Sequence, residues 1–252
     1  MSDLPVFRPG GYRFIPAVFQ YSGGVAAEPG FVLERVTFTK PLPLAEGFRR
    51  AEAIMRAAGR EPTAFAACEL RSPAPFTEAG FKAFNEIYVG TLAAWGIFDG
   101  KTNPVARSNV CPGIAPPAEP SLYAFSYTRV AAPGDPPSFV VAGSGEAAEG
   151  HANYRDHIIK RGDVSPVGMK EKARWVFGEM ERRLQLLGFD WTDTTAVQVY
   201  SVQNYHGALD GGIAPAPSLT HGLTWHFCRP PIVELEYEMD CRGLPVERTL
   251  ST

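Results

Sequence analysis

The chain has 252 residues, of which 45% are hydrophobic and 20% charged, enough for one large domain or two small ones with their own cores. Its formal net charge is −3 and no run of Lys and Arg occurs, which argues against nucleic acid and anionic membranes as partners. No segment approaches the roughly 18 apolar residues of a membrane span, and the first residues lack a basic start before an apolar core, so we expect a cytoplasmic protein.

The first half of the chain predicts the element order ββαβαβ. In chain order, the expected elements are strands at 14–20 and 31–39, a helix at 44–58, a strand at 64–70, a helix at 77–95 and a strand at 122–130. The first two strands are separated by a glycine-containing stretch, which predicts a hairpin. Gly59 is placed to end the first helix, and Thr77 to cap the second.

The second half follows a similar plan after a linker at 131–137. The expected elements are a strand at 139–142, a helix at 167–187, and strands at 194–202 and 232–239. An offset of 129 residues between Gly59 and Gly188, each at a helix end, predicts an internal repeat. We therefore expect two domains, residues 1–132 and 136–252, although the second copy is too rich in Gly and Pro at 207–217 to hold its second helix.

The stretch PVARSNVCPG at 104–113 places Arg107 among small and apolar residues. A guanidinium keeps its charge at all ordinary pH values, so a buried arginine needs an anion, and a planar carboxylate fits its donors best. That anion is either a structural partner, such as Glu69, or a ligand. The residues themselves leave both open.

Three short pieces carry a resemblance to a known family: Ala-Arg-Ser at 106–108, Ala-Gly-Ser-Gly at 142–145 and Val-Glu-Leu-Glu at 233–236. Within the repeated plan they resemble the RidA/YjgF family of imine and enamine deaminases, and the whole chain looks like the tandem branch that includes 2-aminomuconate deaminases. The resemblance implies an α+β fold of two fused RidA/YjgF-like domains, each a mixed sheet with helices on one face. It also implies a homotrimer, because family members are trimers of single domains with ligand clefts between neighbouring subunits. Whether the cleft of this chain lies within a chain or between chains stays open.

The resemblance also implies roles for particular residues. Arg107 would grip a substrate carboxylate and Glu234 would position water, with help from the backbone groups of a loop formed by Gly143, Ser144 and Gly145. Neither half has the full set, because the first half has Tyr123 where the glutamate is expected and the second has no arginine at 214–228. We therefore expect a composite site to which each half contributes a part.

The implied reaction is hydrolytic deamination of a 2-amino-unsaturated dicarboxylate of the 2-aminomuconate type in aromatic-compound degradation. No cofactor or metal is expected, because an imine is already electrophilic. A second carboxylate calls for a second cation, for which Arg71 and Arg229 are candidates. Ser108 and Asn109 are expected to contact substrate, and His226 to donate a proton.

Other interpretations stay open. Glu234, Glu236 and Glu238 alternate with apolar residues and fit a solvated strand face equally well. His226 and Cys228 would lie on the same face of a strand, so a metal site is an alternative interpretation, although their spacing matches no closed zinc pattern. At the level of function, the alternatives are a general 2-imino acid deaminase of RidA type and a non-catalytic protein that binds small carboxylates.

Overall fold

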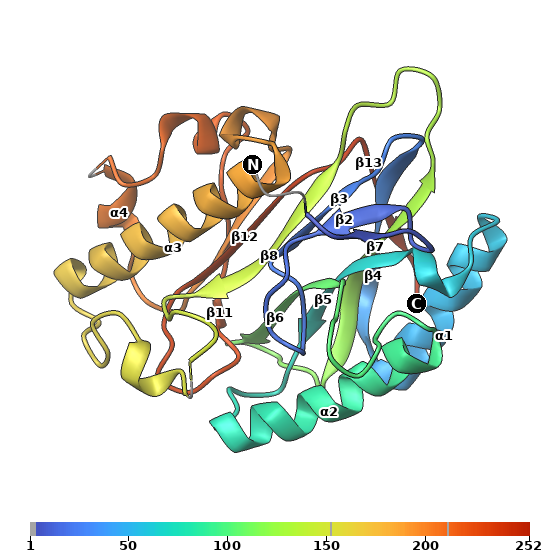
Figure 1. The fold of residues 1–252 in the computed structure, drawn as a ribbon. Helices are drawn as coiled ribbons and strands as arrows, with labels where there is room; N and C mark the ends of the chain where they lie inside the picture. The colour runs from blue at the N-terminus through green and yellow to red at the C-terminus, as the bar shows by residue number, and fades with distance from the viewer. Residues whose placement is uncertain (1–3, 152, 211) are drawn as a thin grey trace.

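The computed structural model describes residues 4–151, 153–210 and 212–252 and arranges them as two mixed sheets covered by helices (Figure 1). The strands are β1 (Val6–Phe7), β2 (Tyr12–Phe14), β3 (Gly24–Ala27), β4 (Phe31–Pro43), β5 (Phe65–Arg71), β6 (Ala106–Pro112), β7 (Ser121–Val130), β8 (Phe139–Gly145), β9 (Ala196–Tyr200), β10 (Thr224–His226), β11 (Cys228–Arg229), β12 (Glu238–Gly243) and β13 (Val246–Leu250). The α-helices are α1 (Leu44–Ala57), α2 (Glu78–Ala94), α3 (Pro166–Leu187) and α4 (His206–Asp210), and single 3-10 turns occur at Pro62–Ala64, Arg155–His157, Trp191–Asp193 and Ala216–Leu219.

The two sheets contain the same four-stranded pattern. The first sheet has the order β11-β6-β5-β7-β4-β13, and the second has the order β1-β2-β3-β8-β12-β9-β10. Within them, β4-β7-β5-β6 and β8-β12-β9-β10 correspond strand for strand, with two antiparallel pairings followed by one parallel pairing in each. The expected internal repeat and the α+β class are confirmed.

The expected helices and their boundary residues are also confirmed. Thr77 caps α2, because its Oγ1 accepts a hydrogen bond from the Gly80 N–H at 3.1 Å. Gly188 ends α3 with φ of 88°, a left-handed conformation that glycine adopts without steric penalty. Among the described residues of the second copy, the five-residue α4 and the 3-10 turn at Ala216–Leu219 lie where the first copy has the long α2, in agreement with the Gly- and Pro-rich sequence there.

Helices cover one face of each sheet, and the other faces pack on each other. Phe48 of α1, Phe65 of β5 and Tyr88 of α2 belong to one buried cluster, and Phe177 of α3 packs with Val199 of β9 in another. Between the sheets, β6 packs against β8. Small side chains allow this close contact, among them Ala66, Ala67, Ala106 and Ala142.

The expected hairpin between 14–20 and 31–39 is wrong. β2 pairs with β3, and β3 pairs with β8 of the second half, whereas β4 pairs with β7. At the other end of the chain, β13 pairs in parallel with β4 and so joins the first sheet. Each sheet therefore includes strands from the opposite half of the sequence, namely β1 to β3 in one and β11 and β13 in the other. The boundaries 1–132 and 136–252 stay a prediction.

The expected strand at 232–239 is also wrong, because β12 begins only at Glu238. Residues 232–235 form a turn closed by the Leu235 N–H and the Ile232 carbonyl at 3.2 Å. Glu234 has φ of 75° inside this turn, which is incompatible with an extended strand. The alternating side chains that predicted the strand therefore do not alternate across a sheet.

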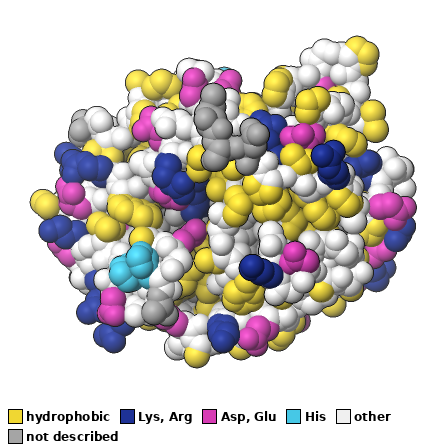
Figure 2. Space-filling model, in the orientation of Figure 1, with side chains coloured by type: hydrophobic (Ala, Val, Ile, Leu, Met, Phe, Trp, Pro, Cys, Tyr) yellow, Lys and Arg dark blue, Asp and Glu magenta, His cyan; other side chains and the backbone are white. Residues whose placement is uncertain are grey.

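The surface agrees with the small net charge. Lys and Arg side chains are interspersed with Asp and Glu over the face shown in Figure 2 and do not gather in one basic area. Among the residues that the structure describes, no helix combines the length and apolar character needed to cross a membrane.

Candidate active site

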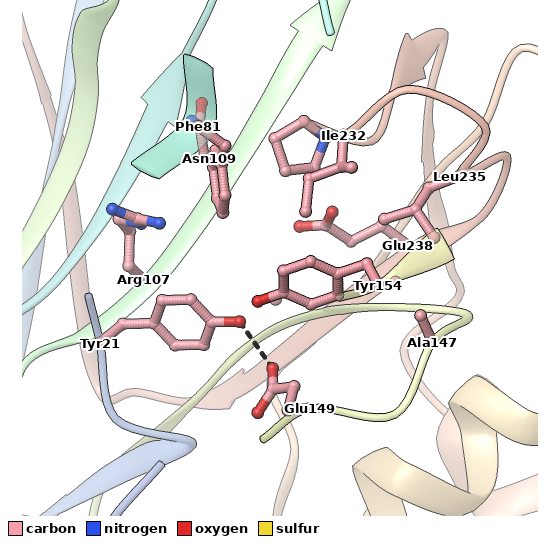
Figure 3. Close-up of a pocket in the computed structure, with 13 residues that line it drawn as sticks. Tyr21, Phe81, Arg107, Asn109, Ala147, Glu149, Tyr154, Ile232, Leu235 and Glu238 are labelled. Carbon is pink, nitrogen blue, oxygen red and sulfur yellow. Dashed lines mark hydrogen bonds between the residues drawn. The ribbon is translucent and has the colours of Figure 1, made fainter. Parts of the chain in front are cut away.

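A pocket with about 430 Å³ of empty space, which includes open solvent at its mouth, lies between β6 of the first half and β8 and β12 of the second (Figure 3). The first half contributes Tyr21, Phe81, Arg107 and Asn109 to its lining, and the second contributes Gly143, Gly145, Ala147, Glu149, Tyr154, Pro231, Ile232, Leu235 and Glu238. Both halves thus contribute to one cavity within a single chain, the arrangement expected of a composite site.

Arg107 is buried in an aromatic surround at one side of this pocket. Its guanidinium carbon lies 4.7 Å from the centre of the Tyr88 ring and 5.1 Å from that of Tyr21, and its Nη1 donates a hydrogen bond to Asn85 Oδ1 at 2.5 Å. Within the described part of the chain, no carboxylate oxygen comes within ion-pair distance of this guanidinium. A desolvated cation flanked by aromatic rings is a strong binding site for a carboxylate.

The alternative that Arg107 pairs with Glu69 is wrong. Glu69 instead accepts two hydrogen bonds from Arg35, at 2.6 and 2.9 Å. The positive charges of Arg35, Arg242 and Arg71 lower the pKa of the buried Glu69 carboxyl to about 2, against the opposing effect of burial. Glu69 is therefore an ionised structural partner of Arg35, and Arg107 remains available for a ligand.

Asn109 adds a second donor to the pocket beside Arg107. The two residues lie on the same face of β6, since side chains two residues apart on a strand point the same way. Asn109 Oδ1 accepts a hydrogen bond from Ser72 at 2.9 Å, which leaves its buried Nδ2 with no partner among the described residues. Ser108 points to the opposite face, where its hydroxyl donates to Asp240 at 2.6 Å.

The glycines at the end of β8 make room for the pocket. A Cβ on Gly143 would collide with Glu238 Oε1 and lie 3.1 Å from Ser108 Cα, and one on Gly145 would lie 2.9 Å from a methyl carbon of Leu235. Ser144 lies between them and does not line the pocket, and its hydroxyl donates to the Gly145 carbonyl at 3.3 Å. The absence of a side chain at Gly143 therefore lets the Glu238 carboxyl enter the cavity, and its absence at Gly145 leaves room for Leu235.

Glu238 is the acidic residue that faces this pocket from β12. It is 3% exposed, and burial raises the pKa of its carboxyl well above the usual range, with a further increase from the charge of Asp240 and an opposing effect of Arg107. No described residue donates a hydrogen bond to its side chain, so nothing except the distant arginines stabilises the ionised form. Such a carboxyl keeps its proton to a higher pH than an exposed glutamate does and can exchange that proton with a ligand.

Glu234, the acid expected from the sequence, lies outside the pocket lining. Its side chain is 39% exposed and forms an ion pair with Arg155 Nε at 3.1 Å. A signal for Glu238 was present in the sequence, because Val-Glu-Leu-Glu at 233–236 is followed at once by Tyr-Glu-Met-Asp at 237–240. Both pieces alternate, but β12 begins only within the second, at Glu238.

Arg71, Arg229 and His226 also lie outside the lining. Arg71 is buried with its guanidinium carbon 4.2 Å from the centre of the Tyr123 ring, and Arg229 lies on β11 at 3.5 Å from Glu236. His226 is hydrogen-bonded to a glutamine at 3.0 Å, and burial lowers its pKa. In the residues that the structure describes, no three His, Cys, Asp or Glu side chains gather as a metal site would require.

Tyr21, Glu149 and Tyr154 are lining residues that sequence reasoning missed. The Tyr21 hydroxyl donates to Glu149 Oε1 at 2.6 Å, and Glu149 also pairs with Arg183 of α3 at 3.2 Å. Burial raises the pKa of Tyr21 well above its ordinary value, so the hydroxyl stays protonated. These residues come from loops before β3 and after β8, and no local pattern predicts that the loops meet.

The repeated sheet topology and the shared pocket define an α+β protein built of two similar halves. Among solved structures, a chorismatase is similar with a TM-score of 0.50 and 12% identity, covering 88% of this chain and 77% of the chorismatase chain. A member of the YjgF/YER057c/UK114 family from Mycobacterium tuberculosis covers 46% of this chain and 82% of its own, with a TM-score of 0.29 and 13% identity.

Sequence comparison narrows the class to a family. The family described as 2-aminomuconate deaminase CnbZ matches residues 4–248. A 2-amino-5-chloromuconate deaminase from Comamonas testosteroni is 51% identical over 251 residues, which cover 99% of this chain and 100% of that protein. The chain belongs to the CnbZ family of 2-aminomuconate deaminases.

Proposed function

We propose that this chain is a cofactor-independent hydrolytic deaminase of 2-aminomuconate-type acids in the degradation of aromatic compounds. The observation that carries the proposal is the buried Arg107, without a carboxylate partner among the described residues, in one pocket with the protonatable Glu238. A carboxylate-binding cation and a proton-exchanging acid are the two groups that hydrolysis of a 2-imino acid requires. Family membership supports the same chemistry.

In the proposed reaction, Arg107 and the free amide hydrogens of Asn109 hold the carboxylate next to the reacting carbon. The enamine first shifts to its imine tautomer. The protonated carboxyl of Glu238 gives its proton to the imine nitrogen, and the resulting carboxylate accepts a proton from the water that attacks the carbon. That proton passes to the nitrogen, and the C–N bond breaks. Ammonia leaves while the hydroxyl oxygen forms the carbonyl and returns its proton to the Glu238 carboxylate, which restores the starting state.

The test is ammonia release from enzymatically generated 2-aminomuconate, followed in parallel by loss of the ultraviolet absorbance of the dienamine. We expect a rate well above the spontaneous one, and loss of that excess in Arg107→Ala. Arg49→Ala is a matched control, because Arg49 forms an exposed ion pair with Glu46 on the surface of α1. A wild-type rate equal to the spontaneous rate would overturn the proposal and favour a carboxylate-binding protein.

A second candidate, a general 2-imino acid deaminase, is favoured by the pocket lining itself. Arg107 is the one arginine or lysine in the described lining, so a single carboxylate satisfies it. Comparing kcat/KM for 2-iminopropionate with that for 2-aminomuconate separates the two candidates. We further propose that the enzyme works in the cytoplasm. We also propose that it forms the homotrimer that the RidA/YjgF resemblance implies, and sedimentation velocity tests this oligomeric state.

A further inference from the structure

An exposed ion pair joins two segments at the rim of the pocket. Arg155 Nε lies 3.1 Å from Glu234 Oε2, and the side chains are 62% and 39% exposed. Arg155 directly follows Tyr154, and Glu234 lies between Ile232 and Leu235, all three of which line the cavity (Figure 3). The guanidinium is therefore placed where both lining segments reach the surface.

The backbones on both sides of this pair are held on the start of α2. Glu78 Oε1 accepts hydrogen bonds from the N–H groups of Tyr154 and Arg155, both at 3.0 Å. On the other side, the Phe76 carbonyl accepts a hydrogen bond from the Val233 N–H at 3.0 Å, and the Phe76 N–H donates one to the Pro231 carbonyl. The rim is thus built on a fixed frame, and the long side chain of Arg155 is the part that can change partner.

The backbone conformation of Glu234 is unusual for a glutamate. Its φ of 75° lies in the left-handed region, which non-glycine residues adopt only when their surroundings require it. The ion pair itself contributes little to stability, because both groups are in contact with solvent. A second anion can therefore replace the Glu234 carboxylate at little expense.

A dicarboxylate substrate presents such an anion. When one carboxylate is bound by Arg107 inside the pocket, the far carboxylate of a muconate points along the cavity and needs a cation of its own. The two arginines expected for this role lie elsewhere, since Arg71 is enclosed by aromatic rings and Arg229 is paired on β11. Arg155 is the arginine at the rim next to the lining segments.

We propose that Arg155 binds the distal carboxylate of the dicarboxylate substrate and that Glu234 is a competing anion that substrate displaces. This inference rests on the proposed function for the substrate class, and it makes Arg155 the residue that separates dicarboxylates from monocarboxylates. Glu234 then opposes substrate binding, in contrast to the water-positioning role expected from the sequence.

The test measures binding by calorimetry with two ligands that cannot be deaminated, muconate and the monocarboxylate sorbate, which has the same six-carbon diene. Arg155→Ala should raise the Kd for muconate about 10-fold, as expected for loss of one charge-assisted hydrogen bond, and leave the Kd for sorbate unchanged. Glu234→Gln should lower the Kd for muconate, because it removes the competitor and keeps the backbone. Arg49→Ala is the control and should leave both Kd values unchanged.

The inference predicts that the two variants change the Kd for muconate in opposite directions, and this difference decides the test. If the ion pair only stabilises the rim, both substitutions break it and change muconate affinity in the same direction, which would overturn the inference. An unchanged Kd for muconate in Arg155→Ala would also overturn it. Because binding is measured without turnover, failure of the proposed deaminase activity shows separately, as wild-type protein that binds muconate and releases no ammonia.

Discussion

Replacing Glu238 by Gln tests whether its carboxyl is neutral in the folded protein. The side chain is 3% exposed and receives no hydrogen bond from a described residue. Burial, reinforced by the charge of Asp240, raises the pKa of the carboxyl well above its ordinary value, and Arg107 only partly offsets this. The folded protein therefore keeps a proton on Glu238 over a pH range in which the unfolded chain has released it.

The sign of the stability change follows from that difference. Above the pKa of about 4.3 of an unfolded glutamate, the folded state binds more protons than the unfolded state, so stability falls as pH rises until the folded pKa is reached. The loss is at most about 1.4 kcal/mol per pH unit from this one group. For a chain of this size, that corresponds to a decrease in Tm of at most about 3–6 °C per pH unit.

Glu238→Gln removes the titrating group and keeps its shape. Thermal unfolding of wild type and variant at half-unit steps from pH 5 upward should give a Tm difference that widens in favour of the variant until the pH reaches the raised pKa of the folded protein. Differences at fixed pH cancel the titration of all other groups. Parallel Tm curves would refute the reasoning, because they would mean that Glu238 titrates in the folded protein as it does in the unfolded chain.

Three further predictions follow from the packing. Gly143→Ala should lower kcat/KM at least about 100-fold, measured by ammonia release, because the added methyl group takes the space of the Glu238 carboxyl. Lys172→Met should lower the free energy of unfolding in urea by about 3–5 kcal/mol, because it leaves the fully buried Glu146 without its cation. An equimolar mixture of Arg107→Ala and Glu238→Gln should recover no activity, because the pocket contains both residues of one chain.

Each of these predictions has a control or a contrary result. Gly90→Ala places the same methyl group in open space on α2 and should leave activity unchanged, so equal losses in both glycine variants would count against the steric argument. A double variant, Lys172→Met with Glu146→Gln, should recover part of the lost stability, and no recovery would argue against an uncompensated charge. Activity in the mixed sample would place the site between chains.

Local sequence signals predicted the parts of this fold that local physics determines. The apolar spacing of the helices, the cap at Thr77 and the left-handed Gly188 act within a few residues, and the structure has them where expected. The internal repeat could be predicted from the sequence for the same reason, because the glycines that end its helices are local signals. The pairing of β3 with β8 joins residues more than a hundred positions apart, and no pattern within either strand specifies its partner.

The candidate site shows the same division. Arg107 was recognised because a cation among small and apolar residues is unusual in itself, and Asn109 because it lies beside Arg107. The glycines of β8 were identified only through the family resemblance. Glu238 was missed because two consecutive alternating segments look alike in sequence. The choice between them is made by tertiary contacts: Glu146 accepts hydrogen bonds from the backbone N–H groups of Glu236 and Tyr237, at 2.7 and 3.0 Å, and the strand begins only after them.

The assignment of the acid–base role to Glu238 is tested most directly by comparing kcat for ammonia release from 2-aminomuconate in Glu238→Gln and Glu234→Gln. The account predicts that Glu238→Gln lowers kcat by about 100-fold or more, the usual contribution of a positioned general acid–base group. It predicts that Glu234→Gln keeps the wild-type kcat, because that side chain lies at the rim and touches no reacting atom. A large loss of kcat in Glu234→Gln together with an active Glu238→Gln would contradict the account.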